Sequence, residues 1–494
     1  MVEVIEYLQV QAIIFDLSFQ YMTRQLFSII GLIGCLLSTN VNAQKFTLKQ
    51  CIDYAWSNNL DIKQSMLNNA SSLIDVKASK ANLLPTLSAS AGQNYQFGRT
   101  VDRFTNTFIN QTIRSNNFGL NAGIMLFSGF QNLNTIKQRK FTQEASEENI
   151  QYTKNLIALN ISSSFLQVIQ AMESINNAQL QINSTQQRID RAQKQVDAGV
   201  ADLSNLLTLK AQVANEQLNL VNAVNSKNVA VLTLRNLMQL PYAEPFEIEV
   251  PSVEGITATR EPVVLEIYET AVNSLPQIKA AVKQSEAANA QTKVSKGLLS
   301  PTITLYGSVS TVYSQSAKNY TINTNPIGYQ TIGYTQNSNE AVLQPLFNYN
   351  SQIIKFGDQF KNNIGQGAGL SFSWNIFNGF QVQNNIQKAK INQQITDMNL
   401  LKQKNTLLND INTAVNSYNA AKAKHDASLN SVEAQKTSLD YIQKRFDAGV
   451  STSFDFINAK NSYLQAQSNE LQAKYELVFR ALILEYYRGN TITL

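Results

Sequence analysis

The 494-residue sequence is poor in charge, histidine and cysteine. Charged residues make up 15% of it, below the quarter or so that is usual in soluble domains. The net charge of +5 is spread along the chain without a basic block, so nucleic acid is not an expected partner. One histidine, two cysteines, no phosphate-cradling glycine loop and no metal-ligand cluster leave little from which to build a catalytic site. We therefore expect no enzymatic activity, no cofactor and no metal.

Long apolar runs are also missing. Beyond the leader, no stretch supplies the roughly 18 consecutive apolar residues that a transmembrane helix needs. The leader itself has a basic start after Met22, an apolar stretch over residues 26–37 and a small-residue cleavage site ending at Ala43. Residues 1–43 are therefore predicted to be an N-terminal extension and a signal peptide that starts at Met22, so the protein is exported.

A second interpretation of the leader is open. Residues 32–35, which end at Cys35, resemble a lipobox, and that motif would make Cys35 a lipidated N-terminus. The apolar pair after Cys35 and the good site at Ala43 favour cleavage instead. With either outcome Cys51 is left without a partner in the chain, so no internal disulfide is expected and a packed thiol is predicted.

Proline and glycine are absent from residues 131–197. In this region Val and Ile recur at steps of seven, at Ile161, Val168, Ile175, Ile182, Ile189 and Val196. A sustained step of seven is typical of a coiled-coil seam, and a helix of this length would extend about 100 Å. We predict that the helix ends at Gly199, and that a second helix over 203–240 folds back antiparallel on it.

The same pattern recurs 250 residues later. The matching seam positions are Ile411, Tyr418, His425, Val432, Leu439 and Phe446. The sequence Asp-Ala-Gly-Val that ends the first helix at 197–200 ends the second at 447–450. The duplication predicts a first repeat over 44–240 and a second over 263–489, with long helices at 381–447 and 453–488. A proline-rich connector, 241–262, joins the repeats, and residues 490–494 form a tail.

Four segments alternate with a period of two, which is typical of strands. The predicted strands are 86–99, 115–127, 302–313 and 365–377. Each has one apolar face and one face of Gly, Ser, Asn or Thr. Residues 46–81 precede the first pair and are predicted to be helical. The polar stretches 100–114 and 314–363 are expected to be loops.

Strands of about twelve residues are long enough to cross a bilayer when tilted. Four strands cannot close into a barrel, and lipid does not tolerate unpaired edges, so closure requires several copies of the chain. Three copies would give twelve strands, with the long helices continuing the wall as a coiled-coil tube. The alternative is a soluble protein in which two β-hairpins pack on helices.

In these features the sequence resembles the TolC-type outer-membrane efflux proteins, which are the outer membrane factors of tripartite efflux and type I secretion systems. The resemblance extends over residues 46–489. Three features show the resemblance: the duplicated helix–strand–strand–long helix–helix unit, Leu84-Pro85 and Ser300-Pro301 before the strands, and the second helix tip. This tip covers residues 445–451 and is followed by the segment 454–459.

The resemblance implies a fold and a function. The expected fold is a mixed α and β membrane protein, a homotrimer with a 12-strand barrel in the outer membrane of a Gram-negative bacterium and a long periplasmic α-helical barrel. It would be an exit duct that passively conducts substrates to the exterior. The implied partners are a periplasmic adaptor (a membrane fusion protein), an inner-membrane pump and outer-membrane lipid.

The resemblance also implies site residues. The helix tips at Gly199, Val200, Gly449 and Val450 would contact the adaptor. The family's pore constriction carries acidic residues six and nine positions after the second tip glycine, where this sequence has Asp455 and Asn458, and Asn205 is the first-half equivalent of Asp455. Three copies of Asp455 would form a constriction that attracts cations.

The gate is expected to differ from the family's pattern. The basic residue that members can carry two positions after the second tip glycine is Ser451 here, so we expect closure by hydrogen bonds rather than by charge. From the residues alone, Asp455 could instead serve only as a carboxylate at a helix N-terminus. Gly199 and Gly449 are in the first place turn glycines.

Two other classes of function remain as alternatives. An exported trimeric coiled-coil structural or adhesin-like protein without a pore would form one parallel stalk, whereas this chain is predicted to turn at Gly199 and Gly449. A periplasmic adaptor would need a β-rich lipoyl-like module beside a single helical hairpin. His425 is expected to be a packed seam residue, and Tyr95, Tyr313 and Trp374 to be aromatics of a membrane interface or of a core.

Overall fold

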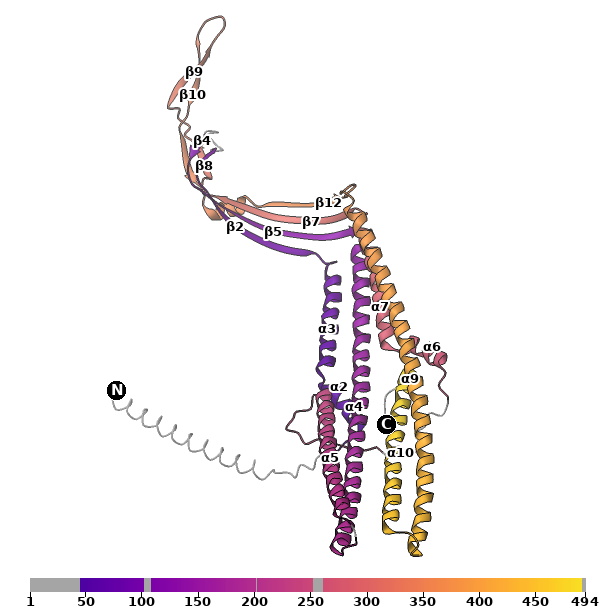
Figure 1. Ribbon diagram of the computed structural model, residues 1–494. Coiled ribbons are helices and arrows are strands. Elements are labelled where there is room, and N and C mark those ends of the chain that lie inside the picture. The colour runs from indigo at the N-terminus through magenta and orange to yellow at the C-terminus, as the bar shows by residue number, and fades with distance from the viewer. Residues whose placement is uncertain (1–44, 102–107, 201, 252–260, 491–494) are drawn as a thin grey trace, which may run out of the picture. The chain divides into compact units, whose positions relative to one another are not determined.

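The computed structural model describes residues 45–101, 108–200, 202–251 and 261–490 (Figure 1). The predicted leader with Met22, Cys35 and Ala43 lies outside the described residues, as does the tail beyond 490. The chain divides into two compact units. The first contains residues 45–65, 150–276 and 405–490, and the second contains 66–149 and 277–404. Because each unit draws on both sequence repeats, the repeats are not separate bodies.

Eight helices of more than ten residues carry most of the described chain. Their bounds are α2 (Leu48–Asn58), α3 (Leu60–Ala81), α4 (Gln131–Asp197), α5 (Leu203–Met238), α6 (Val264–Ser274), α7 (Pro276–Gly297), α9 (Gln381–Asp447) and α10 (Ser453–Tyr487). The two 67-residue helices, α4 and α9, cover the same residues that their period of seven predicts. None of the helices in the described part of the chain is long and apolar enough to cross a membrane.

The single helix expected over residues 46–81 is wrong, because the chain breaks at Asn59. The side chain of Asn59 accepts a hydrogen bond from the backbone N of Asp61 at 2.9 Å and so caps α3. Its Nδ2 donates to the carbonyl oxygen of Leu237 on α5, also at 2.9 Å. Helix α5 ends two residues before the predicted 240 because Gln239 adopts a left-handed conformation with φ 57°. Helix α10 ends at Tyr487, one residue before the predicted 488.

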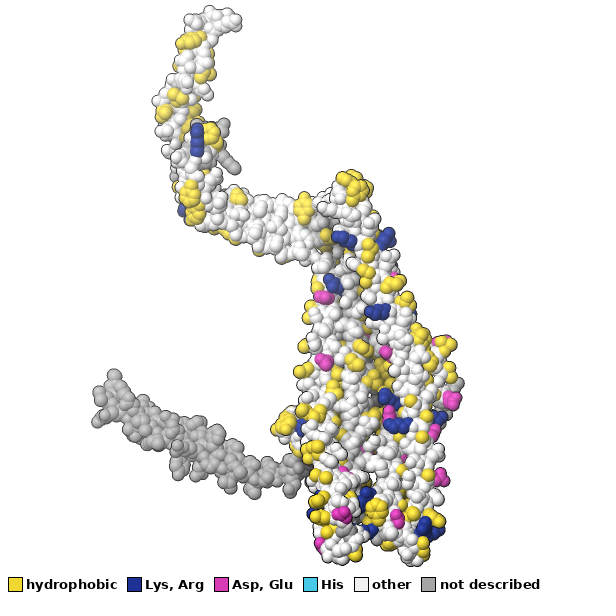
Figure 2. Space-filling model, viewed as in Figure 1, with side chains coloured by type: hydrophobic (Ala, Val, Ile, Leu, Met, Phe, Trp, Pro, Cys, Tyr) yellow, Lys and Arg dark blue, Asp and Glu magenta, His cyan; other side chains and the backbone are white. Residues whose placement is uncertain are grey.

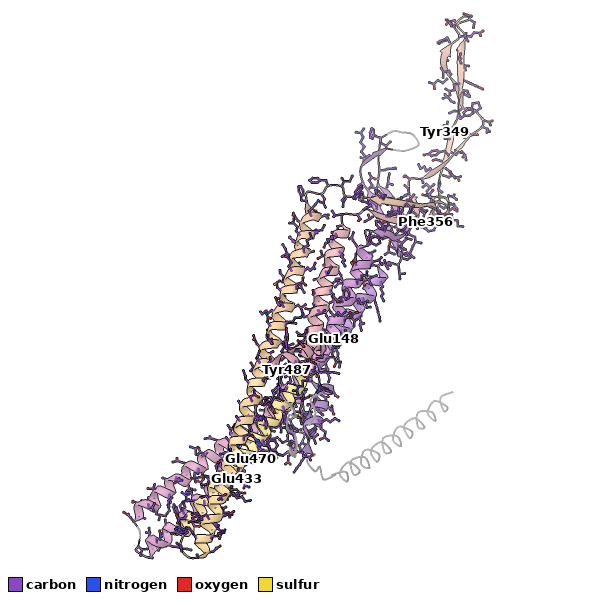
Figure 3. The ribbon with its side chains drawn as sticks, turned by 90° about the vertical axis from the view of Figure 1, so that its right-hand side faces the viewer. Glu148, Tyr349, Phe356, Glu433, Glu470 and Tyr487 are labelled. Carbon is purple, nitrogen blue, oxygen red and sulfur yellow. The ribbon has the colours of Figure 1, made fainter. Side chains whose placement is uncertain are left out.

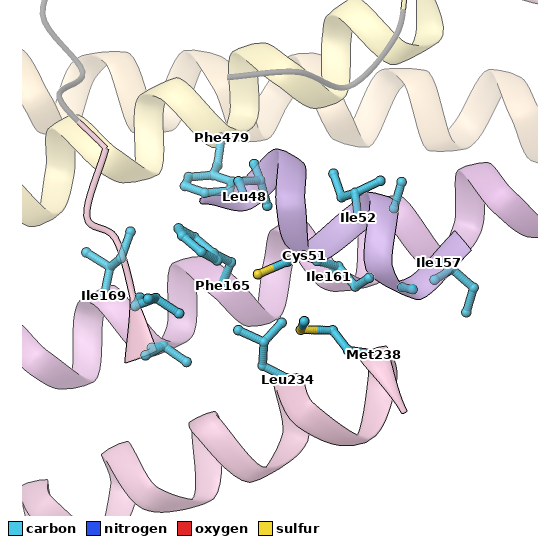
Figure 4. Close-up of a cluster of buried hydrophobic side chains, with 14 of the residues drawn as sticks. Leu48, Cys51, Ile52, Ile157, Ile161, Phe165, Ile169, Leu234, Met238 and Phe479 are labelled. Carbon is cyan, nitrogen blue, oxygen red and sulfur yellow. The ribbon is translucent and has the colours of Figure 1, made fainter. Parts of the chain in front are cut away.

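The main core of the first unit lies where α2, α4, α5 and α10 meet (Figure 4). Phe165 and Ile161 of α4 are fully buried there, together with Leu234 and Met238 of α5. Cys51 of α2 points into the same cluster and has no exposed surface, as expected for a packed thiol. Burial raises the pKa of the Cys51 thiol to about 12, so the thiol is neutral and unreactive at physiological pH.

A four-stranded antiparallel sheet forms the second unit together with α3, α7 and parts of α4 and α9. The strand order is β12 (Gly365–Ser373), β7 (Thr302–Ser314), β5 (Ile113–Ser128) and β2 (Thr86–Gln96). The duplication is visible in the register: Thr86 pairs with Gly123 in the first half, and the repeat equivalents Thr302 and Ser373 pair in the second. Strands β5 and β7 join the halves, so β2 and β12 are open edges in the single chain.

Several predicted bounds of the strands are wrong. Strand β12 ends at Ser373 rather than at 377, because its partner β7 begins at Thr302 and the preceding Pro301 has no N–H to continue the ladder. Strand β2 ends at Gln96 rather than at 99. Strand β5 covers 113–128 rather than 115–127, and β7 extends one residue further than predicted.

The two predicted loops contain regular structure. The first holds a short hairpin of β3 (Arg99–Val101) and β4 (Phe108–Asn110). The second holds a longer ribbon in which β8 (Lys318–Ile322) pairs with β11 (Tyr349–Ile353) and β9 (Gly328–Tyr334) pairs with β10 (Ala341–Leu346). It then forms a short helix, α8 (Phe356–Asn362). One face of β8–β11 carries Ile322 and Tyr349 and the other carries Thr321 and Asn350, an alternation that the mostly polar composition of this stretch conceals.

The turn between β5 and α4 packs tightly on the end of α7. Gly129 has φ +61°, and a Cβ added there would overlap the carbonyl oxygen of Gly297 and lie 2.6 Å from Cβ of Ser300. A Cβ added at Gly297 would lie 2.6 Å from the carbonyl oxygen of Gly129. Glycine at both positions therefore allows the backbones to approach where the first half meets the second.

Candidate functional site

The two helix tips of the first unit have the same backbone geometry. Gly199 and Gly449 both have φ +70°. Val200 N donates to the carbonyl oxygen of Gln195 at 3.0 Å, and Val450 N donates to that of Arg445 at 2.8 Å. These bonds, with the shorter-range bonds from each glycine N, form Schellman motifs that end α4 and α9. The valine side chains are 75% and 67% exposed, so each tip carries an apolar side chain on its surface.

Asp455 occupies the third position of α10 and completes a capping box with Thr452. Its Oδ2 accepts hydrogen bonds from Thr452 N at 3.0 Å, Thr452 Oγ1 at 2.7 Å and Ser451 Oγ at 3.3 Å. The hydrogen bonds from Thr452 are the main cause that lowers the pKa of the Asp455 carboxyl below its usual value. The carboxylate is exposed and charged at neutral pH, and the local role as a helix N-terminal carboxylate is present.

The first tip carries its acidic residue three positions earlier. Asp202 is the N-cap of α5, and its side chain accepts a hydrogen bond from Ser204 N at 2.9 Å. Asn205 is the positional equivalent of Asp455, and its side chain is exposed. Both tips therefore have a carboxylate at a helix N-terminus, which the helix dipole favours. Asp202 is a site residue that sequence reasoning missed. An Asp three positions after the tip glycine, just before an apolar helical pattern, is a recognisable N-cap signal and could have located it.

Polar contacts join α4 of the first hairpin to α10 of the second. Arg188 Nη2 donates a hydrogen bond to Asn458 Oδ1, and the Arg188 guanidinium lies 5.3 Å from the ring centroid of Phe454. Further along the same pair of helices, Asn461 Nδ2 donates to Ser184 Oγ and Ser468 Oγ donates to a carboxylate oxygen of Glu173. The expected site residue Asn458 thus contacts a residue that sequence reasoning missed.

An open groove of about 590 Å³ lies beside these contacts, between α4, α9 and α10. Arg188 is the charged residue that lines it, and the other walls are mainly amide and hydroxyl side chains. They include Gln181, Ser431, Gln435, Asn461, Gln465 and Asn469. Because this groove is polar, the tip ends of the two hairpins can separate here without exposing an apolar core.

Within each hairpin the packing is firmer. In the first, Ile189, Ala192 and Leu206 form a buried cluster near the tip. In the second, the rings of Phe446 and Phe456 stack with their centroids 5.5 Å apart. His425 of α9 lies 3.2 Å from Glu470 of α10 and its side chain is 15% exposed, which agrees with the predicted packed role. Toward the tips, beyond the main core that α10 shares with α4 and α5, the hairpins therefore have apolar contacts inside each and polar contacts between them.

The sheet of the second unit has two contrasting faces. Phe118, Leu120 and Val309 lie on one, and Asn117, Asn121 and Ser308 lie on the other. The apolar face is exposed in the single chain: Leu87 is 70% exposed and Leu370 67%. Few charged side chains are visible on the sheet in Figure 2, whereas the helices carry many. Within the described residues, no three His, Cys, Asp or Glu side chains are placed to hold a metal ion.

This architecture defines a class of protein. One unit has a sheet with open edges and an exposed apolar face, and the other has two long helical hairpins with matching tips. The sequence matches the family described as outer membrane efflux protein over residues 51–238 and 267–486. The chain belongs to this family, as its resemblance to the TolC type predicted.

Named relatives support this assignment. The chain is 22% identical to toxin and drug export protein A of Aggregatibacter actinomycetemcomitans, over 87% of this chain and 83% of that protein. It is 23% identical to outer membrane protein TolC of Escherichia coli K12, over 91% of this chain and 83% of TolC. The crystal structure of the Campylobacter jejuni CmeC outer membrane channel matches with a TM-score of 0.70 and 16% identity, over 90% of this chain and 87% of CmeC. By name, these relatives are an export protein, an outer membrane protein and an outer membrane channel.

Proposed function

We propose that this protein is the outer-membrane exit duct of a tripartite efflux or type I secretion system in a Gram-negative bacterium. Three copies would form a 12-strand barrel continued by an α-helical barrel in the periplasm. The duct would conduct passively, while an inner-membrane pump and a periplasmic adaptor supply the energy and the control. The predicted leader, cleaved after Ala43 or lipidated at Cys35, would direct the export of the chain.

One observation carries this proposal. In the internal repeat, the open edge strands β2 and β12 are equivalent to β7 and β5, which already pair with each other in the single chain. Strands β5 and β7 pair across the two halves, with Asn121 opposite Ser308. The repeat equivalents of these residues are Ser371 on β12 and Gly92 on β2, which lie on opposite edges of one chain. Pairing β12 of one copy with β2 of the next would continue the sheet in the same register and satisfy every edge, as lipid requires.

The helices support the same ring. In the single chain Lys283 of α7 lies 5.3 Å from the ring centroid of Phe141 on α4. The repeat equivalents are Leu67 on α3, which is 71% exposed, and Ile391 on α9, which is 54% exposed. An equivalent contact between neighbouring copies would bury two apolar side chains that water now surrounds. Barrel closure and helix packing therefore point to the same arrangement of copies.

The tips are the proposed control region. Val200 and Val450 would contact the adaptor, with Gly199 and Gly449 holding them in an exposed turn. Asp455 would form a cation-attracting ring near the axis, with Asn458 and Asn205 as its uncharged neighbours. The polar contacts between α4 and α10 support closure by hydrogen bonds, which a partner could open at moderate cost.

The experiment that tests the proposal combines assembly with conduction. The purified protein should migrate as a heat-sensitive trimer, cross-link to three copies and produce ion-conducting steps in a planar bilayer of phosphatidylcholine. Conduction is the outcome that distinguishes a duct from the adhesin-like alternative. A monomer that remains free of lipid and forms no conducting pore would reject the proposal.

A further inference from the structure

The short helix α8 lies on the apolar face of the sheet, where β12 has not yet begun to pair with β7. The amide of Gln359 takes the place of a strand there: its Oε1 accepts from Ser314 N at 2.9 Å and its Nε2 donates to Ser314 O at 3.0 Å. Thr311 Oγ1 donates to the carbonyl oxygen of Phe360 at 2.9 Å, and Asn363 Nδ2 donates to that of Val312 at 2.8 Å. With Gln359 only 2% exposed, α8 is fixed to the sheet rather than loosely attached.

The aromatic side chains of α8 continue the apolar face. Phe356 packs against Tyr313 with ring centroids 5.2 Å apart, and Phe360 packs against Phe118 at 5.5 Å. Phe356, labelled in Figure 3, still has 47% of its surface exposed and Phe360 40%, so the described residues leave an outer side of both rings uncovered. From Phe118 to Leu126 the apolar face of β5 covers nine residues, which is about the length of a tilted strand that crosses a bilayer. Helix α8 therefore lies at the end of this apolar face.

Beside α8 the apolar face is hollowed. A groove of about 480 Å³ lies between Phe360 and Ile364 on one side and Ala91, Leu120 and Val309 on the other. A second groove of about 380 Å³ shares Leu120 and Val309 and continues across the small residues in the middle of the sheet. The two together form a long, open apolar depression whose shape suits a hydrocarbon chain.

Positive charge surrounds the same end of the sheet. Lys355 is the N-cap of α8, Lys361 is in its last turn, and Lys318 begins the ribbon. The guanidinium carbon of Arg114, at the start of β5, lies 5.7 Å from the ring centroid of Tyr313. Among the described residues of α8, of the paired strands β8 and β11, and of the start of β5, Asp358 is the only acidic one. In the described part of the chain none of the three lysines forms an ion pair.

We propose that α8 and the groove beside it bind an anionic, phosphate-bearing lipid of the outer leaflet. An acyl chain would lie in the groove along Phe360 and Ile364, and Lys318, Lys355 and Lys361 would contact the phosphate. This inference rests on the proposed function, because it requires the apolar face to meet lipid. It adds that one region of the barrel wall selects lipid by charge.

A lipid fits this surface better than another copy of the chain. The repeat places the contact between copies along the open hydrogen-bonding edges of β2 and β12, whereas the groove lies on the apolar face of the sheet, over β2, β5 and β7. If the same region of a second copy docked here, its lysines would face Lys318, Lys355 and Lys361 and repel them. An anionic lipid headgroup would instead neutralise their charge. Each lysine near an anionic lipid surface contributes about 1 kcal/mol, which corresponds to about fivefold in affinity.

Native mass spectrometry of the full-length assembly tests the proposal. The probes are phosphatidylglycerol and phosphatidylcholine with identical acyl chains, added at equal concentration. We expect phosphatidylglycerol to remain bound at least fivefold more than phosphatidylcholine. The triple variant Lys318→Gln, Lys355→Gln, Lys361→Gln should lose about tenfold or more of this binding. Inorganic phosphate at millimolar concentration should not compete, because it lacks the acyl chain.

A matched triple variant on α9, Lys388→Gln, Lys390→Gln, Lys402→Gln, removes the same charge elsewhere and should retain lipid binding. If the α8 triple variant does not assemble, the single substitution Lys361→Gln at an exposed side chain should lower binding about fivefold. Equal binding of both lipids, equal losses in the two triple variants, or displacement by phosphate would overturn the inference. Conduction in phosphatidylcholine alone separates that failure from a failure of the proposed function.

Discussion

Arg188 and Asn458 are 270 positions apart in the sequence, and their side chains are hydrogen-bonded between α4 and α10. The same guanidinium lies over the ring of Phe454, one turn earlier on α10. This contact ties the first hairpin to the second close to both tips. If the tips open as proposed, it is among the first interactions to break.

We predict that Arg188→Ala increases the open fraction of the channel. A hydrogen bond from a charged donor contributes about 1.5–3 kcal/mol, and partial exposure at this site reduces that to about 1 kcal/mol. A change of this size shifts an equilibrium about fivefold. Single-channel recording in a planar bilayer should show longer or more frequent open events.

Two controls define the contact. Arg191→Ala removes the same residue type one turn away, where the described chain shows no ion pair or hydrogen bond, and should leave gating unchanged. In a double-mutant cycle, Asn458→Ala should add little once Arg188 is already replaced. Additive effects of the two substitutions would show that the pair does not act as a unit.

We predict that Gly297→Ala destabilises the protein by about 2–3 kcal/mol, because the new Cβ would press on the carbonyl oxygen of Gly129. The midpoint of urea unfolding is the measurement. Gly328→Ala is the control, since a Cβ added at Gly328 meets nothing within 4 Å. Equal stability of the two variants would mean that the turn can relax and that the close approach is not needed.

The charge of Asp455 gives a prediction about pH. Hydrogen bonds from Thr452 lower the pKa of this carboxyl, so it stays ionised below the usual carboxyl range near pH 4. Its contribution to the cap is therefore present above that range and is lost as the pH falls through the lowered pKa. Cation selectivity, measured as a reversal potential in a salt gradient, should follow the same titration.

Asp455→Asn should weaken cation selectivity at neutral pH and remove this acidic titration. Asp440→Asn removes an exposed carboxylate on the neighbouring helix α9, and it should leave the cation selectivity and its titration unchanged. Unaltered selectivity in Asp455→Asn would restrict Asp455 to its local role in capping α10.

Local signals in the sequence were sufficient for the long helices and for the alternating faces of the sheet. No proline or glycine interrupts residues 131–197, and glycine at 199 and 449 supplies the left-handed residue that ends each helix. The break at Asn59 was missed because asparagine is tolerated within helices, and its cap depends on a bond to Leu237, 178 positions away. Helix α8 was missed because seven residues are too few to show a period.

The candidate site was predictable only in part. The duplicated sequence located the tip glycines, and the family resemblance located Asp455 and Asn458. Whether these residues act in gating and adaptor binding stays a prediction. Arg188 could not be found in this way. Its partner is on a helix of the other half, and nothing in the heptad pattern of α4 indicates which polar residue will face α10.

The central claim is that neighbouring copies share one sheet, and disulfide cross-linking of Ser90→Cys with Ser373→Cys tests it most directly. The repeat places these residues opposite each other across two copies, whereas within one chain two strands separate β2 from β12. Oxidation should produce covalent dimers and trimers on a non-reducing gel. The control pair Ala91→Cys with Ser373→Cys puts the thiols on opposite faces and should remain monomeric. Monomers alone with the first pair, or equal cross-linking of both pairs, would contradict the account.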